Sequence, residues 1–147
     1  MATRPLPETV PADLADRLRA RFQDWPLIAA WGLAIEALEP GRAEVSLPAT
    51  PAVTNGPRGH VNGGVLAALA DLASALALST AFEGRMPFAT SDLHIRYLEP
   101  AVGMVTAKAE VVRLSERSGV VECRIHAGGE IACLSTAQFA IRRGLAG

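Results

Sequence analysis

Two features of the stretch from His60 to Phe82 could support chemistry: the paired glycines Gly63-Gly64 and a single carboxylate, Asp71. A helix that starts at the glycines presents unpaired N–H groups and a partial positive charge at that end. Glycine also lets a ligand oxygen approach the backbone closely. A carboxylate in an apolar helix is costly to bury, so its presence there needs a reason. A base and a backbone N–H donor together are the minimum needed for acyl transfer.

The same residues also have a purely structural interpretation. Paired glycines at the start of a helix can simply form a tight turn, and an aspartate in a core helix can be bonded to a backbone amide. Carboxylates with perturbed surroundings also occur in structural networks. The residue types alone leave both interpretations open.

The helix that must position these groups is apolar on almost every face from residue 65 to 82. A helix of this kind is buried, and its alanines and leucines favour helix strongly. It would be about 27 Å long, the width of a small domain. A bilayer-spanning role is disfavoured, because Asp71 near its middle would cost about 3 kcal/mol in a membrane. We therefore expect a soluble, cytoplasmic protein with no membrane association.

The chain before residue 30 predicts a separate arm. Prolines at 5 and 7 suggest a loose segment over residues 1–10, after which Pro11 starts a helix that Pro26 ends. Apolar side chains recur every four residues in this helix: Leu14, Leu18 and Phe22. We expect residues 1–29 to form an arm and short helix, and residues 30–147 to form the main domain.

The remaining pattern predicts an α+β fold with a long antiparallel sheet. Apolar–polar alternation and turn residues predict six strands, at 31–38, 42–47, 88–98, 104–114, 120–127 and 131–141. Residues 50–59 form a loop that leads into the central helix. One sheet curled around this helix would cover only part of its apolar surface, which suggests a partner subunit.

Composition adds limits on function. A formal net charge of -1 on 147 residues favours neither nucleic acid nor an anionic membrane as a partner. The first residues lack the apolar run of a secretory signal, so we expect no such signal. Cys123 and Cys133 lack metal-ligand spacing and are expected to be reduced core thiols.

The predicted order of elements resembles the hotdog fold, in which a long antiparallel sheet wraps one central helix. The run Asn62–Asp71 resembles the "HGG…AD" signature of hotdog thioesterases of the PaaI and 4-hydroxybenzoyl-CoA thioesterase type. The run Ser91–Ala101 resembles the next strand of that family, which typically ends in Tyr-x-x-Pro-Ala. The resemblance covers about residues 30–142.

The resemblance implies an acyl-CoA thioesterase that acts as a homodimer or as a dimer of dimers (a homotetramer), with active sites at the subunit interface. By position, Asp71 would be the nucleophile or the general base. The Gly63 N–H would donate to the thioester carbonyl oxygen, and Gly64 would support the turn. Asn55 would orient water or substrate, and Thr90 would assist the carboxylate. The resemblance implies no metal or redox cofactor. Coenzyme A is part of the substrate rather than a cofactor.

Three departures from the family pattern affect these assignments. Asn62 replaces the usual histidine and cannot titrate near neutral pH, although His60 could compensate. Asn55 lies one residue further from the carboxylate than the pattern expects. Ser91 competes with Thr90 as the hydroxyl that meets the carboxylate, and a β-bulge would decide between them.

Other residues have one functional and one ordinary interpretation each. We expect the substrate to be contacted by Asn62, Gly64, His60, Ser91 and Arg58. Four aromatic residues could line an acyl pocket or pack in the core: Trp25, Trp31, Phe82 and Phe88. Four loop arginines could bind coenzyme A phosphates or be ordinary surface charges: Arg58, Arg85, Arg113 and Arg117.

Two other functions fit the same fold. A hotdog hydratase or dehydratase would need a catalytic histidine, and only His60 lies near the glycines. A non-catalytic acyl-CoA-binding protein would not need Asp71. A transcriptional sensor is disfavoured, because the arm before residue 30 is too short for a DNA-binding domain.

Overall fold

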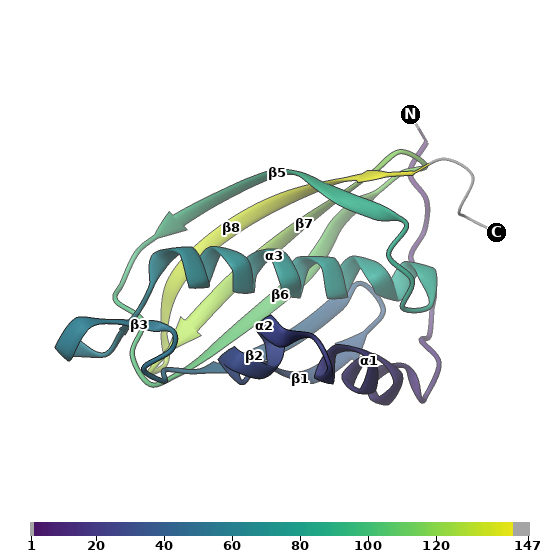
Figure 1. Cartoon of the computed structure of the whole chain (residues 1–147). Coiled ribbons are helices and arrows are strands. Elements are labelled where there is room, and N and C mark those ends of the chain that lie inside the picture. The colour runs from purple at the N-terminus through teal and green to yellow at the C-terminus, as the bar shows by residue number, and fades with distance from the viewer. Residues whose placement is uncertain (1, 143–147) are drawn as a thin grey trace.

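The computed structural model describes residues 2–142, and in them one six-stranded antiparallel sheet curves around a long helix (Figure 1). The strands follow the order β1-β2-β6-β7-β8-β5. Their bounds are β1 (Ala34–Glu39), β2 (Arg42–Pro48), β5 (Phe88–Tyr97), β6 (Met104–Leu114), β7 (Ser118–Ala127) and β8 (Glu130–Ile141). The α+β architecture expected from the sequence is confirmed. The last residues of the expected main domain, 143–147, lie outside the described residues.

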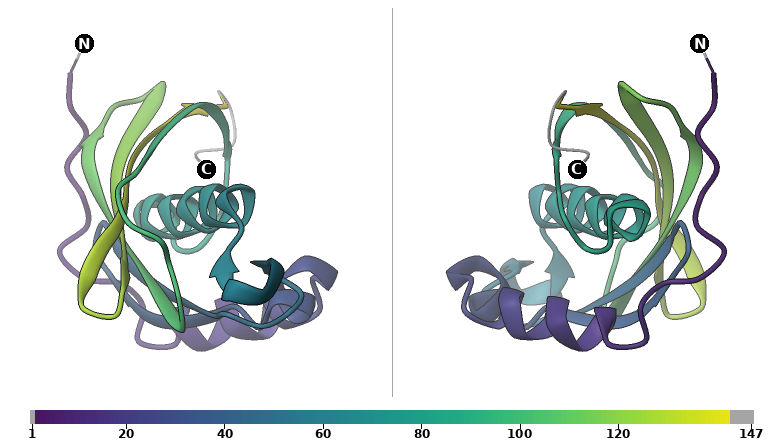
Figure 2. Two further views of the ribbon diagram at one scale, coloured as in Figure 1. Left: turned by 90° about the vertical axis from the view of Figure 1, so that its left-hand side faces the viewer. Right: turned by 90° about the vertical axis from the view of Figure 1, so that its right-hand side faces the viewer.

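The long helix α3 (Gly63–Ser79), continued by the 3-10 turn η2 (Thr80–Phe82), lies within the curve of the sheet (Figure 2). Its inner side chains, such as Leu69 and Leu76, are fully buried against inward-facing strand residues such as Val45 and Ile125. By length and composition the segment Gly63–Phe82 could cross a membrane, but 67% of its most apolar 18-residue stretch is buried inside the fold. This is the position of a core helix.

An N-terminal helix, α1 (Leu14–Gln23), covers the outer edge of the sheet at β1. It begins three residues later than predicted, because Pro11 forms a turn in which its carbonyl accepts from the Leu14 N–H. The Arg19 guanidinium fixes α1 to the sheet by donating to the carbonyls of Ile35, at 2.8 Å, and Glu36, at 3.2 Å. The predicted apolar stripe is buried as expected: Leu14, Leu18 and Phe22.

A second short helix, α2 (Pro26–Trp31), replaces the beginning of the first predicted strand. Pro26 occupies the first turn of α2, where proline is well tolerated. Gly32 ends the helix with φ of 67°, a left-handed conformation that glycine adopts without strain. The prediction that Trp31 starts a strand was therefore wrong, and β1 begins at Ala34.

The first residues are held by the sheet, so the prediction of a loose segment was wrong for the part that the structure describes. Thr3 forms a β-bridge with Ser115, and the Arg4 N–H donates to the Leu114 carbonyl at 2.8 Å. The Arg4 guanidinium also lies 5.0 Å from the centre of the Phe82 ring. These contacts join the arm to the far end of α3.

The loop before α3 contains a small hairpin that the sequence did not predict. It consists of β3 (Thr54–Asn55), a 3-10 turn η1 (Gly56–Arg58) and β4 (His60–Val61). Asn55 pairs with His60 across this hairpin. The hairpin therefore brings two candidate site residues together at the start of α3.

The two cysteines are free and fully buried, as predicted. Burial raises the pKa of Cys123 to about 12 and that of Cys133 to about 11. Both thiols therefore stay protonated at neutral pH. Nucleophilic reactivity would need the deprotonated thiolate.

Candidate active site

The first turn of α3 is organised by Asn62, which caps the helix. The Asn62 Oδ1 accepts from the Gly64 N–H at 2.8 Å and from the Val65 N–H at 3.3 Å. The Asn62 carbonyl accepts from the Leu66 N–H at 3.0 Å. Within the described residues, the N–H of Gly63 has no acceptor. The cap therefore leaves the Gly63 N–H as a backbone donor at the positive end of the helix.

Asn62 also connects the helix to the hairpin. Its Nδ2 donates to the Asn55 Oδ1 at 2.8 Å. This hydrogen bond occupies the Asn55 Oδ1, so the N–H groups of the Asn55 side-chain amide remain available to other partners. The structure thus brings Asn55, His60 and Asn62 together, with Arg58 exposed at the tip of the hairpin.

Tyr97 supports the same turn from β5 and was missed as a site residue. Its hydroxyl donates to the Gly63 carbonyl at 2.6 Å. Its ring lies 3.4 Å from the position that a Gly63 Cβ would take. Burial, and then the nearby Cys133 thiol, raise the pKa of Tyr97, so that the phenol remains a donor. The available sequence signal was the Tyr-x-x-Pro-Ala motif, in which this tyrosine stands.

Asp71 lies two turns further along α3 and is bonded to the neighbouring strand. The Thr90 Oγ1 donates to the Asp71 Oδ1 at 2.7 Å. The pairing of β5 with β8 shifts between Thr90 and Asp92, which leaves Ser91 in a bulge. The Ser91 hydroxyl instead donates to the Gln138 carbonyl at 3.1 Å. The bulge therefore selects Thr90, and the alternative that Ser91 meets the carboxylate was wrong.

The two groups needed for acyl transfer are too far apart to act together within one chain. Gly63 and Asp71 are separated by eight residues, which is about 12 Å along a helix. A reacting carbonyl must lie about 3 Å from both its attacking group and its N–H donors. Each chain therefore places the Gly63 N–H and the Asp71 carboxylate at two separate positions, which are two candidate half-sites.

Both half-sites belong to the part of α3 that the sheet does not cover. This open face carries the exposed Gly64 and the half-buried Ala68, Asp71, Leu72 and Ala75. The strand β5 borders it and, within residues 2–142, pairs only with β8, so its outer edge has no strand partner. Small side chains on the helix and an unpaired strand edge leave this surface suited to close approach by another chain.

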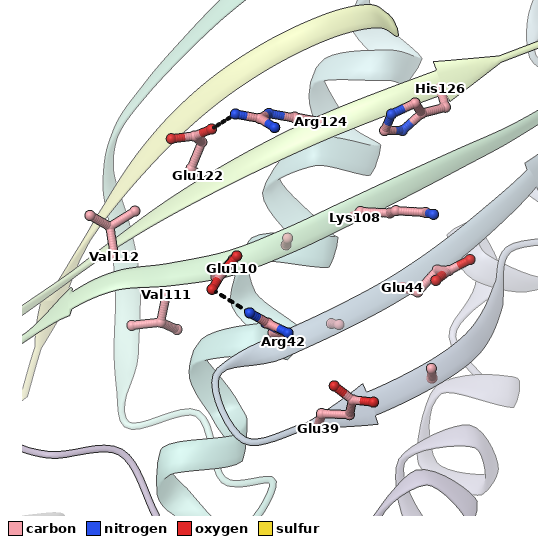
Figure 3. Close-up of a pocket in the computed structure, with 13 residues that line it drawn as sticks. Glu39, Arg42, Glu44, Lys108, Glu110, Val111, Val112, Glu122, Arg124 and His126 are labelled. Atoms are coloured by element: carbon pink, nitrogen blue, oxygen red, sulfur yellow. Dashed lines mark hydrogen bonds and ion pairs between the residues drawn. The ribbon is translucent and has the colours of Figure 1, made fainter. Parts of the chain in front are cut away.

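A hollow of about 830 Å³ on the opposite face of the sheet is not this site (Figure 3). Its polar lining consists of charged strand residues and His126, which face away from α3. Ion pairs of 2.9 Å join Arg42 to Glu110 and Arg124 to Glu122. The Glu110 carboxylate raises the pKa of Arg42. The candidate residues lie on the other face of the sheet.

The loop arginines are spread widely over the fold. Arg85 follows the C-terminal end of α3 and donates to the Phe82 carbonyl at 3.2 Å. Arg113 and Arg117 lie at the connection from β6 to β7. Of the four arginines, only Arg58 lies on the hairpin that carries Asn55.

Comparison with known proteins agrees with this fold. A family model described as "Thioesterase superfamily" matches residues 58–134. A Halobacterium salinarum protein, provisionally named an esterase, is 32% identical over 136 residues, or 90% of each chain. A variant of the phenylacetic acid degradation protein PaaI from Thermus thermophilus is 30% identical, with a TM-score of 0.71 over 80% of this chain and 99% of that one. A thioesterase from Haemophilus influenzae is 25% identical, with a TM-score of 0.79 over 89% and 92% of the two chains.

The fold and the helix motif together define a hotdog thioesterase of the PaaI type. The chain belongs to the thioesterase superfamily, and its activity is that of a thioester hydrolase.

Proposed function

We propose that the protein hydrolyses acyl- or aryl-CoA thioesters to the free acid and coenzyme A, with Asp71 and the Gly63 N–H as the reacting groups. The observation that carries this proposal is the Asn62 cap. It bonds the N–H groups of Gly64 and Val65 and leaves that of Gly63 without an acceptor among the described residues. A free donor at a helix N-terminus, on the helix that bears the carboxylate, supports stabilisation of an oxyanion.

Two subunits would complete the site. If two α3 helices lie antiparallel along their open faces, the Gly63 end of one chain approaches Asp71 of the other. The separation of about 12 Å within one chain, the small side chains on the open face and the unpaired edge of β5 all support this arrangement. Hotdog thioesterases are typically acyl-CoA-binding oligomers, and we propose a homodimer or a dimer of dimers here.

In this arrangement the Gly63 N–H polarises the thioester carbonyl. Asp71 either attacks the carbonyl carbon to form a mixed anhydride, which water then hydrolyses, or removes a proton from the attacking water. In both routes the C–S bond breaks and the electron pair leaves on the coenzyme A thiolate, a good leaving group that needs no strong acid. Thr90 orients the carboxylate, and Asn55 orients water or substrate.

The residues around the helix start would hold the substrate. Asn62 and Gly64 keep the donor in place, and His60 and Arg58 on the hairpin face the polar part of coenzyme A. Ser91 stays a predicted substrate contact through its place in the bulge next to Thr90. The two free cysteines fit a reducing compartment, so we also propose a cytoplasmic location.

The test is coenzyme A release from a panel of acyl-CoAs, followed with a thiol reagent, for wild type, Asp71→Asn and the control Asp92→Asn. Buried thiols react slowly, so Cys123 and Cys133 add little background. We expect Asp71→Asn to lose at least about 100-fold in kcat while keeping its oligomeric state, and Asp92→Asn to stay near wild type. A folded Asp71→Asn protein with wild-type turnover would refute the assignment.

A further inference from the structure

An apolar groove of about 380 Å³ runs between the N-terminal helices and α3. Figure 1 shows α1 and α2 on the side of α3 where β1 and β2 lie, and β5 on the other side. The groove is lined by apolar side chains from α1, α2, β1, β2 and α3 and from the loop after α2, but none from β5. These side chains are Phe22, Ile28, Leu33, Ile35, Val45, Leu72 and Leu76.

The groove offers no free charge to a ligand. Arg19 is its one charged lining residue, and its guanidinium is bonded to the Asp16 carboxylate at 3.0 Å and to two carbonyls of the sheet edge. These bonds also fix the distance between α1 and β1. Gln23 is the other polar side chain in the lining. A ligand group that fills the rest of the groove must be uncharged and apolar, because a buried polar group without a partner is costly.

The groove begins next to the candidate carboxylate. Leu72 follows Asp71 directly, and Leu76 lies one turn further along. With 3.6 residues per turn, the side chains of Ala68 and Ala75 lie between those of Asp71 and Leu76 when viewed down the helix axis. Both alanines are half-buried on the open face. Their small side chains leave a path along the helix surface from the carboxylate into the groove.

We infer that this groove binds the acyl part of the thioester and that α1 and α2 set its size. The inference rests on the proposed function and specifies its substrate as a CoA thioester of a medium-length alkyl chain or a single aromatic ring. A cavity of about 150 Å³ is enough to hold benzene, so this groove accommodates such a group and is poorly filled by acetyl. Its outer wall comes from residues before the segment matched by the family model.

The aromatic residues predicted for an acyl pocket lie elsewhere. Phe82 and Phe88 pack against each other near the far end of α3, with ring centres 5.9 Å apart. Trp25 is 45% exposed and packs in a T-shaped arrangement with Phe22, with ring centres 4.4 Å apart. Neither Trp25 nor Trp31 lines the groove, whereas Phe22 does.

A matched pair of substitutions on α2 tests the inference. Ala29 and its neighbour Ala30 are both exposed on α2, but only Ala29 lines the groove. Ala29→Phe would fill the groove, and Ala30→Phe adds the same side chain outside it. For each variant, kcat/KM is measured with acetyl-, hexanoyl-, octanoyl- and benzoyl-CoA. We expect wild type to prefer the larger groups, and Ala29→Phe to lower the octanoyl-to-acetyl ratio about tenfold or more, with Ala30→Phe unchanged.

The outcomes separate the groove from the catalytic proposal. If wild type hydrolyses none of the thioesters, the proposed function fails. Two other outcomes overturn only the groove assignment. In the first, wild type is active but prefers acetyl-CoA. In the second, the two phenylalanine variants have the same octanoyl-to-acetyl ratio of kcat/KM. Should Ala29→Phe fail to fold, Leu72→Ala enlarges the groove instead and must raise the octanoyl-to-hexanoyl ratio; an unchanged ratio likewise overturns the assignment.

Discussion

Thr90 and Tyr97 lie seven residues apart on β5, yet both side chains bond to α3. In a regular strand, an odd separation would place them on opposite faces. The bulge at Ser91 adds one residue between them and reverses the alternation. One irregularity therefore lets a single strand hold both the Asp71 carboxylate and the Gly63 carbonyl.

Replacing Thr90 with valine should lower kcat about tenfold and leave KM nearly unchanged. The substitution removes the 2.7 Å hydrogen bond to Asp71, and a bond to a charged group is worth about 1.5–3 kcal/mol. Ser91→Ala is the comparison, because the Ser91 hydroxyl bonds to the Gln138 carbonyl and not to Asp71. As a predicted substrate contact, Ser91 should affect KM rather than kcat. Steady-state kinetics give kcat and KM for both variants and test this expectation. Equal losses in the two would show that the bulge, rather than the Thr90 hydroxyl, matters for turnover.

Asn62 should affect stability and catalysis through different atoms. Asn62→Ala removes the cap and should cost about 1 kcal/mol in the free energy of unfolding. Asn62→Asp keeps an oxygen for the N–H groups of Gly64 and Val65 but loses the Nδ2 donor to Asn55. We expect the aspartate variant to keep its stability and to lose turnover.

Urea denaturation and kinetics on the two Asn62 variants separate these effects. If Asn62→Asp kept full turnover, the link from Asn62 to Asn55 would have no part in catalysis. If Asn62→Ala were as stable as wild type, the cap would contribute nothing measurable to the free energy of unfolding.

Tyr97→Phe should reduce kcat severalfold without changing the thermal midpoint by more than a few degrees. The phenyl ring still packs against Gly63, but the 2.6 Å hydrogen bond to its carbonyl is lost. Tyr97 is 50% exposed, so the free energy of unfolding should change by only about 1 kcal/mol. A variant with unchanged kcat on the best substrate would show that Tyr97 does not position the Gly63 peptide.

Stability should fall in alkaline solution because of the buried thiols. Burial raises the pKa of Cys123 to about 12, whereas in the unfolded chain a cysteine titrates near 8.5. Above about pH 8.5 the unfolded state therefore loses this proton first, and the free energy of unfolding falls by at most about 1.4 kcal/mol per pH unit up to about pH 12. Below that range the contribution is fully present.

Chemical denaturation of wild type and Cys123→Ala at several pH values between about 7 and 10 measures this effect. The substitution lowers stability at every pH by leaving a small cavity, so the slopes, not the absolute values, are compared. We expect a shallower slope for Cys123→Ala. Identical slopes would mean that the thiol is not responsible.

The sequence determined the elements because their signals are local. Alternation of apolar and polar residues fixed the strands, and an apolar run with one carboxylate identified α3 and Asp71. The short helix α2 was missed because its six residues carry no clear helical period, and its last residue, Trp31, was assigned to the following strand. The hairpin at Asn55 and His60 was missed for a similar reason, since each strand has only two residues.

Only the tertiary structure decided how the site is built, because its contacts join residues distant in the chain. The choice of Thr90 over Ser91 depends on a bulge set by pairing with β8. The contact of Tyr97 with Gly63 spans 34 residues, and the groove beside Leu72 is closed by a helix that ends before residue 24. Local periodicity carries no information on such contacts, since they follow from how the sheet curves and which elements pack against α3.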